Sequence, residues 1–283
     1  MRADHTIFLR PLNAGVTFDK TDPWELAADP RGMWTVQTGA MGKQNDYGVV
    51  SDGYGFEDSP DCERISGGKN SKGPYAVAIG RQANMLQWGF YCAPDRMTDS
   101  GKSAFLNAIV YMKQFDGHRP LTKKKGRSRE WYQQYVAMVR GLDGKYKRYG
   151  ASFRDYVKKQ FPPAVIEKHG LDADALESWR LANVEYMVGA DRWKFEIDAD
   201  LKKLELSNRK PEFLDWLVER LKKDPKDPLA AKLAARYLGK QPHEVIPFLK
   251  ANRTWLFFTD TGGFRWLVDE NAKARESATA HGR

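Results

Sequence analysis

Lys250-Ala-Asn-Arg-Thr-Trp-Leu-Phe-Phe-Thr-Asp260 indicates how the C-terminal half is built, because an earlier segment repeats its pattern. The earlier copy is Leu181-Ala-Asn-Val-Glu-Tyr-Met-Val-Gly-Ala-Asp191. After a short insertion the match continues, with Trp193-Lys-Phe-Glu-Ile-Asp198 against Phe264-Arg-Trp-Leu-Val-Asp269. The identical pairs are Ala182 and Ala251, Asn183 and Asn252, Asp191 and Asp260, Asp198 and Asp269, and Lys202 and Lys273. The chain therefore contains an internal repeat, residues 181–202 and 250–273.

Each copy has the pattern of a β-hairpin followed by a helix. An apolar run leads to a turn, and the next run places apolar side chains at every second position, which is the period of a strand. Asp198 and Asp269 follow those second runs, where a carboxylate accepts amide hydrogen bonds at the start of a helix. We interpret the repeated aspartates as caps and turn residues rather than as a catalytic carboxylate pair. Because there are two copies and not a long array, we expect the hairpins to pair about a pseudo-twofold axis.

The composition is that of a folded protein that relies on its own core. Of the 283 residues, 41% are hydrophobic and 29% are charged, and no apolar run approaches the roughly 20 residues of a membrane helix. The two cysteines cannot supply a disulfide framework or a four-thiolate zinc site. The net charge of +9 allows attraction to polyanions.

Short strands and one helix are predicted in the N-terminal part. The apolar runs at residues 75–79 and 85–90 are too short for helices and are separated by turn formers, which predicts two buried strands joined by a tight turn. Thr98 is expected to cap a helix that ends before Gly117. Its apolar positions, at the three-and-four spacing of one buried face, are Phe105, Ala108, Ile109, Met112 and Phe115.

The whole sequence predicts an α+β fold in three parts. Residues 1–118 are expected to form a small partial sheet with a closing helix. Residues 119–128 are interpreted as a solvated basic linker. This segment contains all but the last residue of the densest basic run of the chain, which is Lys123, Lys124, Lys125, Arg127 and Arg129. Residues 129–283 are expected to be rich in helices and to contain the two β-hairpins of the repeat.

A series of short motifs occurs in a fixed order in the N-terminal part. They are Asp4-His-Thr-Ile-Phe8, Gly68-Lys-Asn-Ser-Lys-Gly-Pro-Tyr-Ala-Val-Ala-Ile-Gly-Arg81, Trp88-Gly-Phe90, Pro94, Met97-Thr98 and Phe105-Leu-Asn-Ala-Ile-Val-Tyr111. Together they resemble the C-terminal part of ThuA-like domains of planctomycete type, which belong to the class I glutamine amidotransferase-like superfamily. The resemblance covers about residues 1–118.

This resemblance implies a truncated domain. Members of the family have a flavodoxin-like core before this portion, and we expect this chain to be a relative that lacks the core unless upstream sequence is missing. No Cys, His and Glu arrangement of the glutaminase type maps onto these residues, so glutaminase activity is not implied. A link to carbohydrate utilisation is what the resemblance suggests.

An acidic loop and a glycine-rich stretch provide the candidate ligand-binding residues. The acidic cluster consists of Asp52, Glu57, Asp58, Asp61 and Glu63. Carboxylates beside aromatic rings suit Ca²⁺ or sugar hydroxyls, and the alternative is a solvated loop. The stretch at residues 66–73 has the composition of a hairpin connection, and the alternative is an anion site. The selected residues are Asp52, Tyr54, Glu57, Asp58, Lys69 and Asn70.

No catalytic residue, metal ligand or cofactor is assigned from the sequence. Cys62 lies among acidic residues that would raise its thiol pKa, and Cys92 is expected in the core. The five histidines are scattered, with no pair at helical ligand spacing. Gly101-Lys-Ser103 lacks the earlier glycine of a phosphate loop and is interpreted as an ordinary helix N-terminus.

The sequence therefore favours a non-catalytic binding or assembly protein. Its partner would be another protein or a second copy, bound through an exposed apolar face on the strands of residues 75–90. One alternative is a carbohydrate-active hydrolase or sugar-modifying enzyme that uses the acidic loop. Another is a polyanion-binding protein that uses residues 123–129, although nucleic acid is not the favoured partner. The opening residues lack the apolar stretch of a signal peptide, so the expected location is cytoplasmic, with export if the N-terminus is incomplete.

Overall fold

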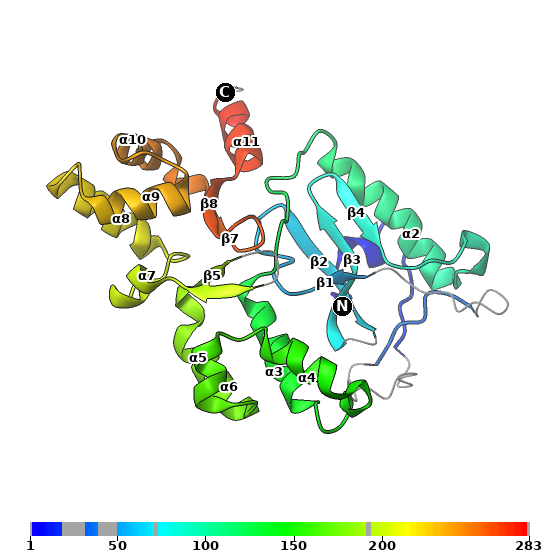
Figure 1. Ribbon diagram of the computed structural model, residues 1–283. Coiled ribbons are helices and arrows are strands. Elements are labelled where there is room, and N and C mark those ends of the chain that lie inside the picture. The colour runs from blue at the N-terminus through cyan, green and yellow to red at the C-terminus, as the bar shows by residue number, and fades with distance from the viewer. Residues whose placement is uncertain (1, 19–31, 39–49, 71–72, 191–193, 282–283) are drawn as a thin grey trace. The chain divides into compact units, whose positions relative to one another are not determined.

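The computed structural model describes residues 2–18, 32–38, 50–70, 73–190 and 194–281 of the chain (Figure 1). The chain forms two compact units, Met1–Pro120 and Leu121–Arg283. Helices and small antiparallel sheets occur in both units, so the predicted α+β class is confirmed.

The first unit is built on an antiparallel sheet with a long central strand. The strands are β1 (Ser51–Asp52), β2 (Cys62–Asn70), β3 (Gly73–Gln82) and β4 (Met85–Trp88). In the centre, β3 pairs with β2 along one edge and with both β4 and β1 along the other, at different parts of its length. The predicted tight turn between two strands is confirmed, because β3 and β4 are joined at Ala83 and Asn84. The prediction that both strands are buried is wrong for β4, whose residues are exposed or half-buried because, within the described part of the chain, it is paired along one edge only.

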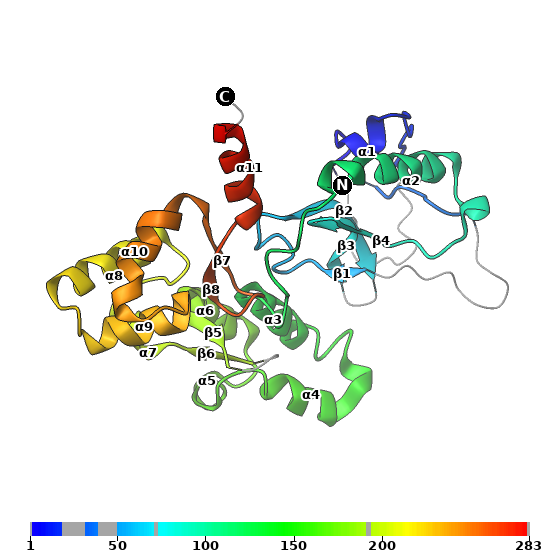
Figure 2. The same cartoon turned by 90° about the horizontal axis from the view of Figure 1, so that it is seen from above.

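One face of this sheet is covered by α1 (Thr6–Leu9) and α2 (Asp99–Met112), which lie together in Figure 2. Thr98 caps α2 as predicted, since its hydroxyl accepts a hydrogen bond from the Gly101 amide at 3.0 Å. The predicted buried face is wrong in one respect, because Ile109 is 56% exposed. Small side chains such as Ala104 and the polar Asn107 face inward instead, and Asn107 donates to backbone carbonyls of the α1 segment.

A loop that follows β1 covers the opposite face of the sheet. Phe56 from this loop packs on Gly80, where an added Cβ would lie 2.6 Å from the Phe56 ring. Residues 76–79 of β3 are all buried. The expectation of an exposed apolar face is therefore wrong for the centre of this strand, although Tyr75 and Met85 are exposed.

The second unit consists mainly of helices. They are α3 (Tyr132–Arg140), α4 (Gly150–Lys158), α5 (Pro163–His169), α6 (Ala173–Asn183), α7 (Ala199–Lys203), α8 (Pro211–Lys223), α9 (Pro228–Leu238), α10 (Pro242–Asn252) and α11 (Glu270–His281). Its strands are β5 (Met187–Gly189), β6 (Phe195–Ile197), β7 (Leu256–Thr259) and β8 (Arg265–Val268). Short 3-10 turns lie at η1 (Pro94–Arg96) and η2 (Lys113–Phe115) in the first unit, and at η3 (Arg129–Trp131), η4 (Lys147–Tyr149), η5 (Val184–Tyr186) and η6 (Arg253–Trp255) in the second.

The internal repeat is confirmed as a repeated structure. One copy runs through α6, η5, β5, β6 and α7, and the other through α10, η6, β7, β8 and α11. In each copy the backbone amide of the capping aspartate donates to the carbonyl of the last residue of the 3-10 turn. Asp198 donates to Tyr186 at 2.9 Å, and Asp269 donates to Trp255 at 2.8 Å. The hairpins form two separate sheets rather than one, and they meet where the Phe195 and Phe264 rings pack edge to face, 6.3 Å apart.

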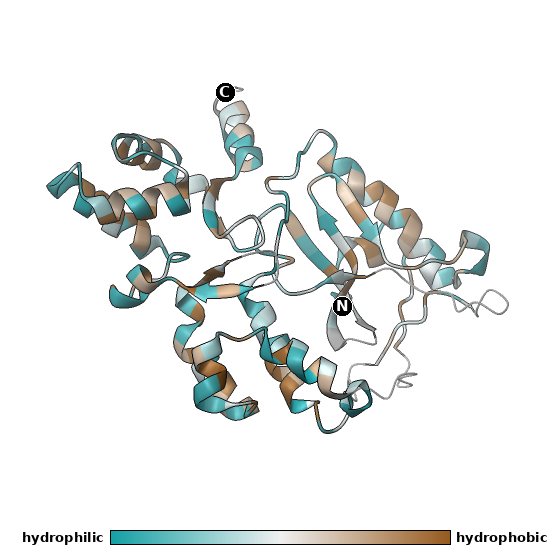
Figure 3. Ribbon diagram, viewed as in Figure 1, coloured by the Kyte–Doolittle hydropathy of each residue, from teal (hydrophilic) through white to brown (hydrophobic). Residues whose placement is uncertain are grey.

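Two apolar clusters hold the second unit together. One gathers around α8, α9 and α10, and the other around α3, α5 and α6. Phe195 packs against both clusters, so the first hairpin of the repeat joins them. Along the helices, hydrophobic residues alternate with hydrophilic ones, as expected for helices that bury one face (Figure 3).

Candidate functional site

Glu63, near the start of β2, is the centre of a polar cluster in the first unit. Its Oε1 accepts hydrogen bonds from Arg2 Nη1 at 2.7 Å and from His5 Nε2 at 3.2 Å. Its Oε2 accepts from Tyr111 Oη at 2.5 Å and from Arg81 Nε at 3.3 Å. These contacts join the chain terminus, the sheet and α2 through one carboxylate.

The cluster fixes the protonation states of two of its members. The hydrogen bond from His5, followed by those from Tyr111 and Arg81, outweighs burial and holds the pKa of Glu63 far below its usual value of 4.5. Burial and the adjacent Glu63 carboxylate raise the pKa of Tyr111 to about 12. At neutral pH Glu63 is therefore ionised and Tyr111 protonated, which suits a structural anchor better than an acid or base that must exchange protons.

The orientation of His5 follows from its place at the start of α1. Its Nδ1 accepts a hydrogen bond from the Ile7 amide at 3.3 Å, so its Nε2 is the nitrogen that donates to Glu63. The ring also packs edge to face on Tyr111, with centroids 4.9 Å apart. His5 thus acts as both a helix cap and a partner of the carboxylate.

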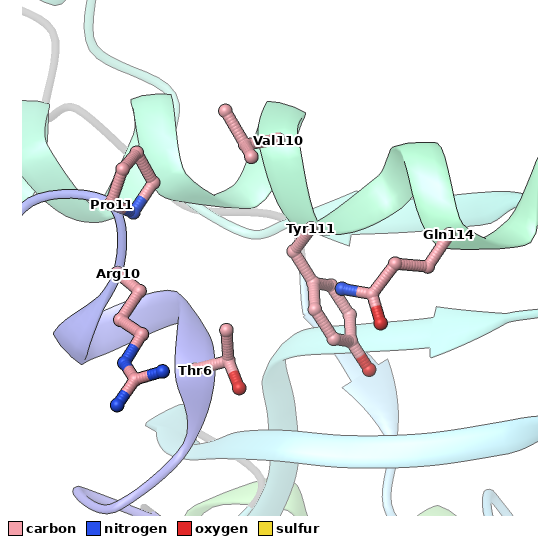
Figure 4. Close-up of a pocket in the computed structure, with 6 residues that line it drawn as sticks. All are labelled: Thr6, Arg10, Pro11, Val110, Tyr111 and Gln114. Atoms are coloured by element: carbon pink, nitrogen blue, oxygen red, sulfur yellow. The ribbon is translucent and has the colours of Figure 1, made fainter.

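A groove with a volume of about 490 Å³ lies beside this cluster, between α1 and α2 (Figure 4). Its lining residues are Thr6, Arg10, Pro11, Val110, Tyr111 and Gln114. Arg10 and Gln114 supply polar groups, and the Tyr111 ring and Val110 supply apolar area. The groove therefore offers a mixed surface with a cationic end.

Five half-exposed aliphatic side chains come from α1, from the segment that follows it and from α2. We call them the α1–α2 apolar surface, which consists of Leu9, Leu12, Leu106, Ile109 and Val110, each 43% to 56% exposed. The three from α2 are at i, i+3 and i+4 and so share one helix face. Asn107 fixes the α1 side, because it accepts a hydrogen bond from the Leu12 amide at 2.9 Å and donates to the Leu12 carbonyl at 2.6 Å.

The acidic residues selected from the sequence serve local structure. Asp52 Oδ1 accepts from the Tyr54 amide at 3.0 Å, and Glu57 Oε1 accepts from the Arg64 amide at 3.0 Å. Tyr54 packs on Tyr75, with ring centroids 5.1 Å apart, and Asp58 is half-buried in the same loop. The other selected residues, Lys69 and Asn70, lie at the end of β2, and their side chains are outside the described residues.

Glu63 and Asp61, the remaining members of the acidic cluster, are separated by their environments. Asp61 is buried and accepts a hydrogen bond from the Ser59 hydroxyl, whereas Glu63 belongs to the cluster with His5 and Tyr111. Sequence reasoning missed these partners because 58 residues separate His5 from Glu63, and 48 separate Glu63 from Tyr111. The family resemblance at residues 4–8 drew attention to the segment that contains His5, but it did not indicate that His5 contacts Glu63.

The basic run at residues 123–129 lies at the start of the second unit and contacts other residues of that unit. The Lys124 ammonium donates to Thr261 Oγ1 at 3.2 Å, and the Arg127 guanidinium lies 3.9 Å from the Trp131 ring centroid. Arg129 is fully buried and paired with Asp260. The interpretation of this run as a solvated surface is therefore wrong for Arg129, which cannot reach a polyanion.

The two cysteines and Gly101 have structural surroundings. Cys92 is buried as predicted, and Cys62 lies half-buried at the start of β2. An added Cβ at Gly101 would lie 2.5 Å from the Val36 carbonyl oxygen, so this glycine permits a close backbone approach at the start of α2.

Among the described residues, no group of three or more His, Cys, Asp and Glu side chains is placed to hold a metal ion. Within that same part of the chain, no helix is long and apolar enough to cross a bilayer.

Comparisons with known proteins add no relative. No family model, curated protein or solved structure matches the chain.

Proposed function

We propose that this chain is a non-catalytic binding protein whose first unit docks a protein partner through the α1–α2 apolar surface. The observations that carry the proposal are five half-exposed aliphatic side chains on α1, α2 and the segment after α1, the hydrogen bonds that hold Leu12 against α2, and the open groove that Val110 lines. Isolated exposed aliphatic residues are common, but contiguous ones rimmed by polar groups are typical of interaction sites.

The groove indicates the chemistry of the partner. Two helical elements flank it, which is the arrangement that receives an amphipathic helix with aliphatic residues at three-and-four spacing. Arg10 lines one side, so an acidic residue next to the aliphatic stripe of the partner would complete the charge pairing. The partner in this proposal is therefore a helical segment with an aliphatic face and an acidic flank.

A non-catalytic role is supported by the state of the acidic residues. The oxygens of Asp52 and Glu57 accept backbone amides, and Glu63 is fixed as an anion by its four donors. Carboxylates committed to structure in this way are poorly suited to general acid–base catalysis. The hydrolase alternative accordingly has less support.

The resemblance to ThuA-like domains belongs to the same proposal. In that interpretation residues 1–118 derive from the closing part of such a domain, and the binding role is linked to carbohydrate utilisation. This part rests on the motifs at residues 4–8 and 68–111 alone.

The test uses a matched pair of leucines on helices. Leu106 on α2 is 51% exposed and Leu181 on α6 is 60% exposed, so aspartate should be tolerated by the fold at either position. Peptides of about 15 residues, selected from a displayed library against the full chain, should carry the three-and-four aliphatic pattern. We expect Leu106→Asp to abolish their binding and Leu181→Asp to leave it unchanged.

Two outcomes would overturn the proposal. One is a set of selected peptides that binds the Leu106→Asp variant as well as the parent. The other is a parent protein that sediments as a dimer while Leu106→Asp sediments as a monomer, because the surface would then be occupied by a second copy.

A further inference from the structure

Residues 143–159 of the second unit combine aromatic and basic side chains to an unusual degree. They include η4 and α4, and their sequence is Asp-Gly-Lys-Tyr-Lys-Arg-Tyr-Gly-Ala-Ser-Phe-Arg-Asp-Tyr-Val-Lys-Lys (Figure 1). Six of these residues are basic, two are acidic and four are aromatic. Val157 is the one buried residue of the segment, so nearly all of this chemistry lies at the surface.

The aromatic side chains form a continuous ladder, which we call the α4 aromatic ladder and define as Tyr146, Tyr149, Phe153 and Tyr156. Centroid distances are 6.3 Å from Tyr146 to Tyr149, 5.5 Å from Tyr149 to Phe153, and 6.0 Å from Phe153 to Tyr156. The last pair is stacked, with 27° between the ring planes. Tyr149 is 49% exposed and Tyr156 is 44% exposed, so the ladder presents ring area to an incoming ligand.

Basic groups are interleaved with the rings. Lys145 Nζ lies 5.2 Å from the Tyr146 ring centroid, and Arg148 Cζ lies 4.9 Å from that of Tyr149. Arg148 also donates to the Tyr149 hydroxyl at 2.9 Å, which holds the guanidinium at this tyrosine.

The two acidic residues offset only part of this charge. Asp143 pairs with Arg154, and Asp155 lies 3.8 Å from Lys158. Lys145, Lys147, Arg148 and Lys159 are exposed and give the ladder a net positive flank. The surface therefore has both ring faces and an excess of cations.

We propose that the α4 aromatic ladder binds single-stranded nucleic acid. Unpaired bases would stack on Tyr149 and Tyr156, while the phosphates lie along Lys147 and the other basic groups of the flank. This combination of stacking rings and a cationic path is how sequence-tolerant proteins hold single strands. It is a second binding function, on a different unit from the α1–α2 apolar surface, and does not depend on that proposal.

Other anionic or ring-binding ligands fit the surface less well. A membrane surface calls for an exposed aliphatic, Phe or Trp face that enters the lipid, but Phe153 is half-buried and Val157 is buried. A neutral sugar would stack on the tyrosines without using the cations. A duplex hides its base faces, so it would engage the cations and leave the rings unused.

The first measurement is binding of the full chain to fluorescent oligouridylate and oligothymidylate of about 20 nucleotides, with rising KCl. With three to four phosphates neutralised, the logarithm of the binding constant should fall against the logarithm of salt with a slope of roughly −2 to −3. Duplex of the same length should compete weakly.

Aromatic variants separate stacking from charge. Tyr149→Ala should weaken binding about 5- to 150-fold, which corresponds to the loss of one stacked base, and Tyr149→Phe should keep it near the parent level. Tyr91, which is 69% exposed in the first unit, provides the control, and Tyr91→Ala should have no effect.

The double change Lys147→Gln and Arg148→Gln should make the dependence of the binding constant on salt less steep, with a slope smaller in magnitude by about 1.4. The control double change, Lys222→Gln with Lys223→Gln, should leave that slope unchanged.

Three results would overturn the proposal. The first is no saturable binding of either oligonucleotide at low salt. The second is equal binding of duplex and single strand with no loss in Tyr149→Ala, which would indicate charge attraction alone. The third is binding to vesicles of anionic lipid that is tighter than binding to the oligonucleotides and depends on the same tyrosines.

Discussion

Arg129 and Asp260, which are 131 residues apart in the sequence, form a buried ion pair in the second unit. Arg129 Nη2 lies 2.9 Å from Asp260 Oδ1, and the Arg129 backbone amide donates to Oδ2 at 2.8 Å. The guanidinium also donates to the carbonyls of Val184 and Glu185 in η5, at 3.3 Å and 3.2 Å. One side chain therefore joins the 3-10 turn of the first repeat copy to the hairpin turn of the second.

Replacement of Asp260 by alanine should strongly destabilise the second unit. The change leaves the Arg129 cation buried without its counter-charge, and breaking a buried pair in this way costs about 3 to 5 kcal/mol. Urea unfolding followed by far-ultraviolet circular dichroism measures this loss, because all helices of the described residues except α1, α2, η1 and η2 belong to this unit.

The control for this prediction is an exposed pair in the same unit. Arg253 and Asp215 lie 2.7 Å apart with both side chains about half exposed, so Asp215→Ala should cost at most about 1 kcal/mol. Equal losses for the two variants would show that the Asp260 pair is not sheltered from solvent.

The repeat predicts matched effects at Asn183 and Asn252. Each side chain donates to the carbonyl four residues earlier, at 2.7 Å and 2.9 Å, and each accepts from the lysine of its own copy, at 2.8 Å and 2.7 Å. Alanine at either position should lower the unfolding free energy by about 1 to 3 kcal/mol, because one charged and one neutral hydrogen bond are lost. Urea unfolding should show that the two variants lose similar amounts of unfolding free energy.

Lysine variants provide the comparison for this pair. Lys202→Met and Lys273→Met remove only the charged hydrogen bond, so each should cost less than the asparagine change in the same copy. A large loss in one copy and none in the other would contradict the structural equivalence of the repeats.

The two capping aspartates should differ, although they occupy equivalent positions. Both accept backbone amides at a helix start, but Asp198 Oδ2 also accepts from Tyr237 Oη at 2.5 Å and from Arg236 Nη1 at 3.1 Å. Asp269→Ala should cost about 1 kcal/mol for the lost cap. Asp198→Ala should cost about 2 to 4 kcal/mol, because it also leaves the buried Tyr237 hydroxyl without this acceptor.

A double-mutant cycle isolates the tyrosine contribution. If the Tyr237 hydrogen bond causes the difference, Tyr237→Phe should cost much less in the Asp198→Ala background than in the parent. Additive losses in chemical denaturation would instead assign the difference to the Arg236 contact.

These relationships show which parts of the structure a sequence can predict. The repeat hairpins, the cap at Thr98 and the tight turn at Ala83 depend on residues close together in the chain, and composition and period express such local preferences directly. The face of α2 was harder to predict, because it depends on Asn107 binding carbonyls of a segment about 100 residues away. Local periodicity put both Ala108 and Ile109 inside, whereas the buried face of α2 contains Ala104, Asn107 and Ala108 and leaves Ile109 exposed.

The candidate site was less predictable than the fold. The acidic loop was visible as composition, but whether each carboxylate is free depends on partners elsewhere in the chain. Glu63 is bound by Arg2, His5, Arg81 and Tyr111, and Asp260 by Arg129. No spacing pattern brings such residues together, so their structural role emerges only from the packed chain.

The Glu63 cluster predicts a specific dependence of stability on pH. The pKa of Glu63 in the folded chain lies well below the value of 4.5 expected when the chain is unfolded, so the folded state binds this proton more weakly. The stabilisation is therefore complete above about pH 4.5 and is lost as the pH falls toward the folded pKa. Glu63→Gln should destabilise the first unit by about 1.5 to 3 kcal/mol at neutral pH, because hydrogen bonds to a charged group are lost.

Hydrogen exchange of peptides from β2 and β3 reports on this unit separately from the rest. After correction for intrinsic exchange rates, the protection difference between parent and Glu63→Gln should be largest at neutral pH and should narrow progressively below pH 4.5. Peptides from α8 to α10 serve as the internal control and should exchange alike in both proteins. A difference that stays constant through the acid range would mean that the variant acts through packing, and that the charge of Glu63 does not anchor α1 and α2 to the sheet.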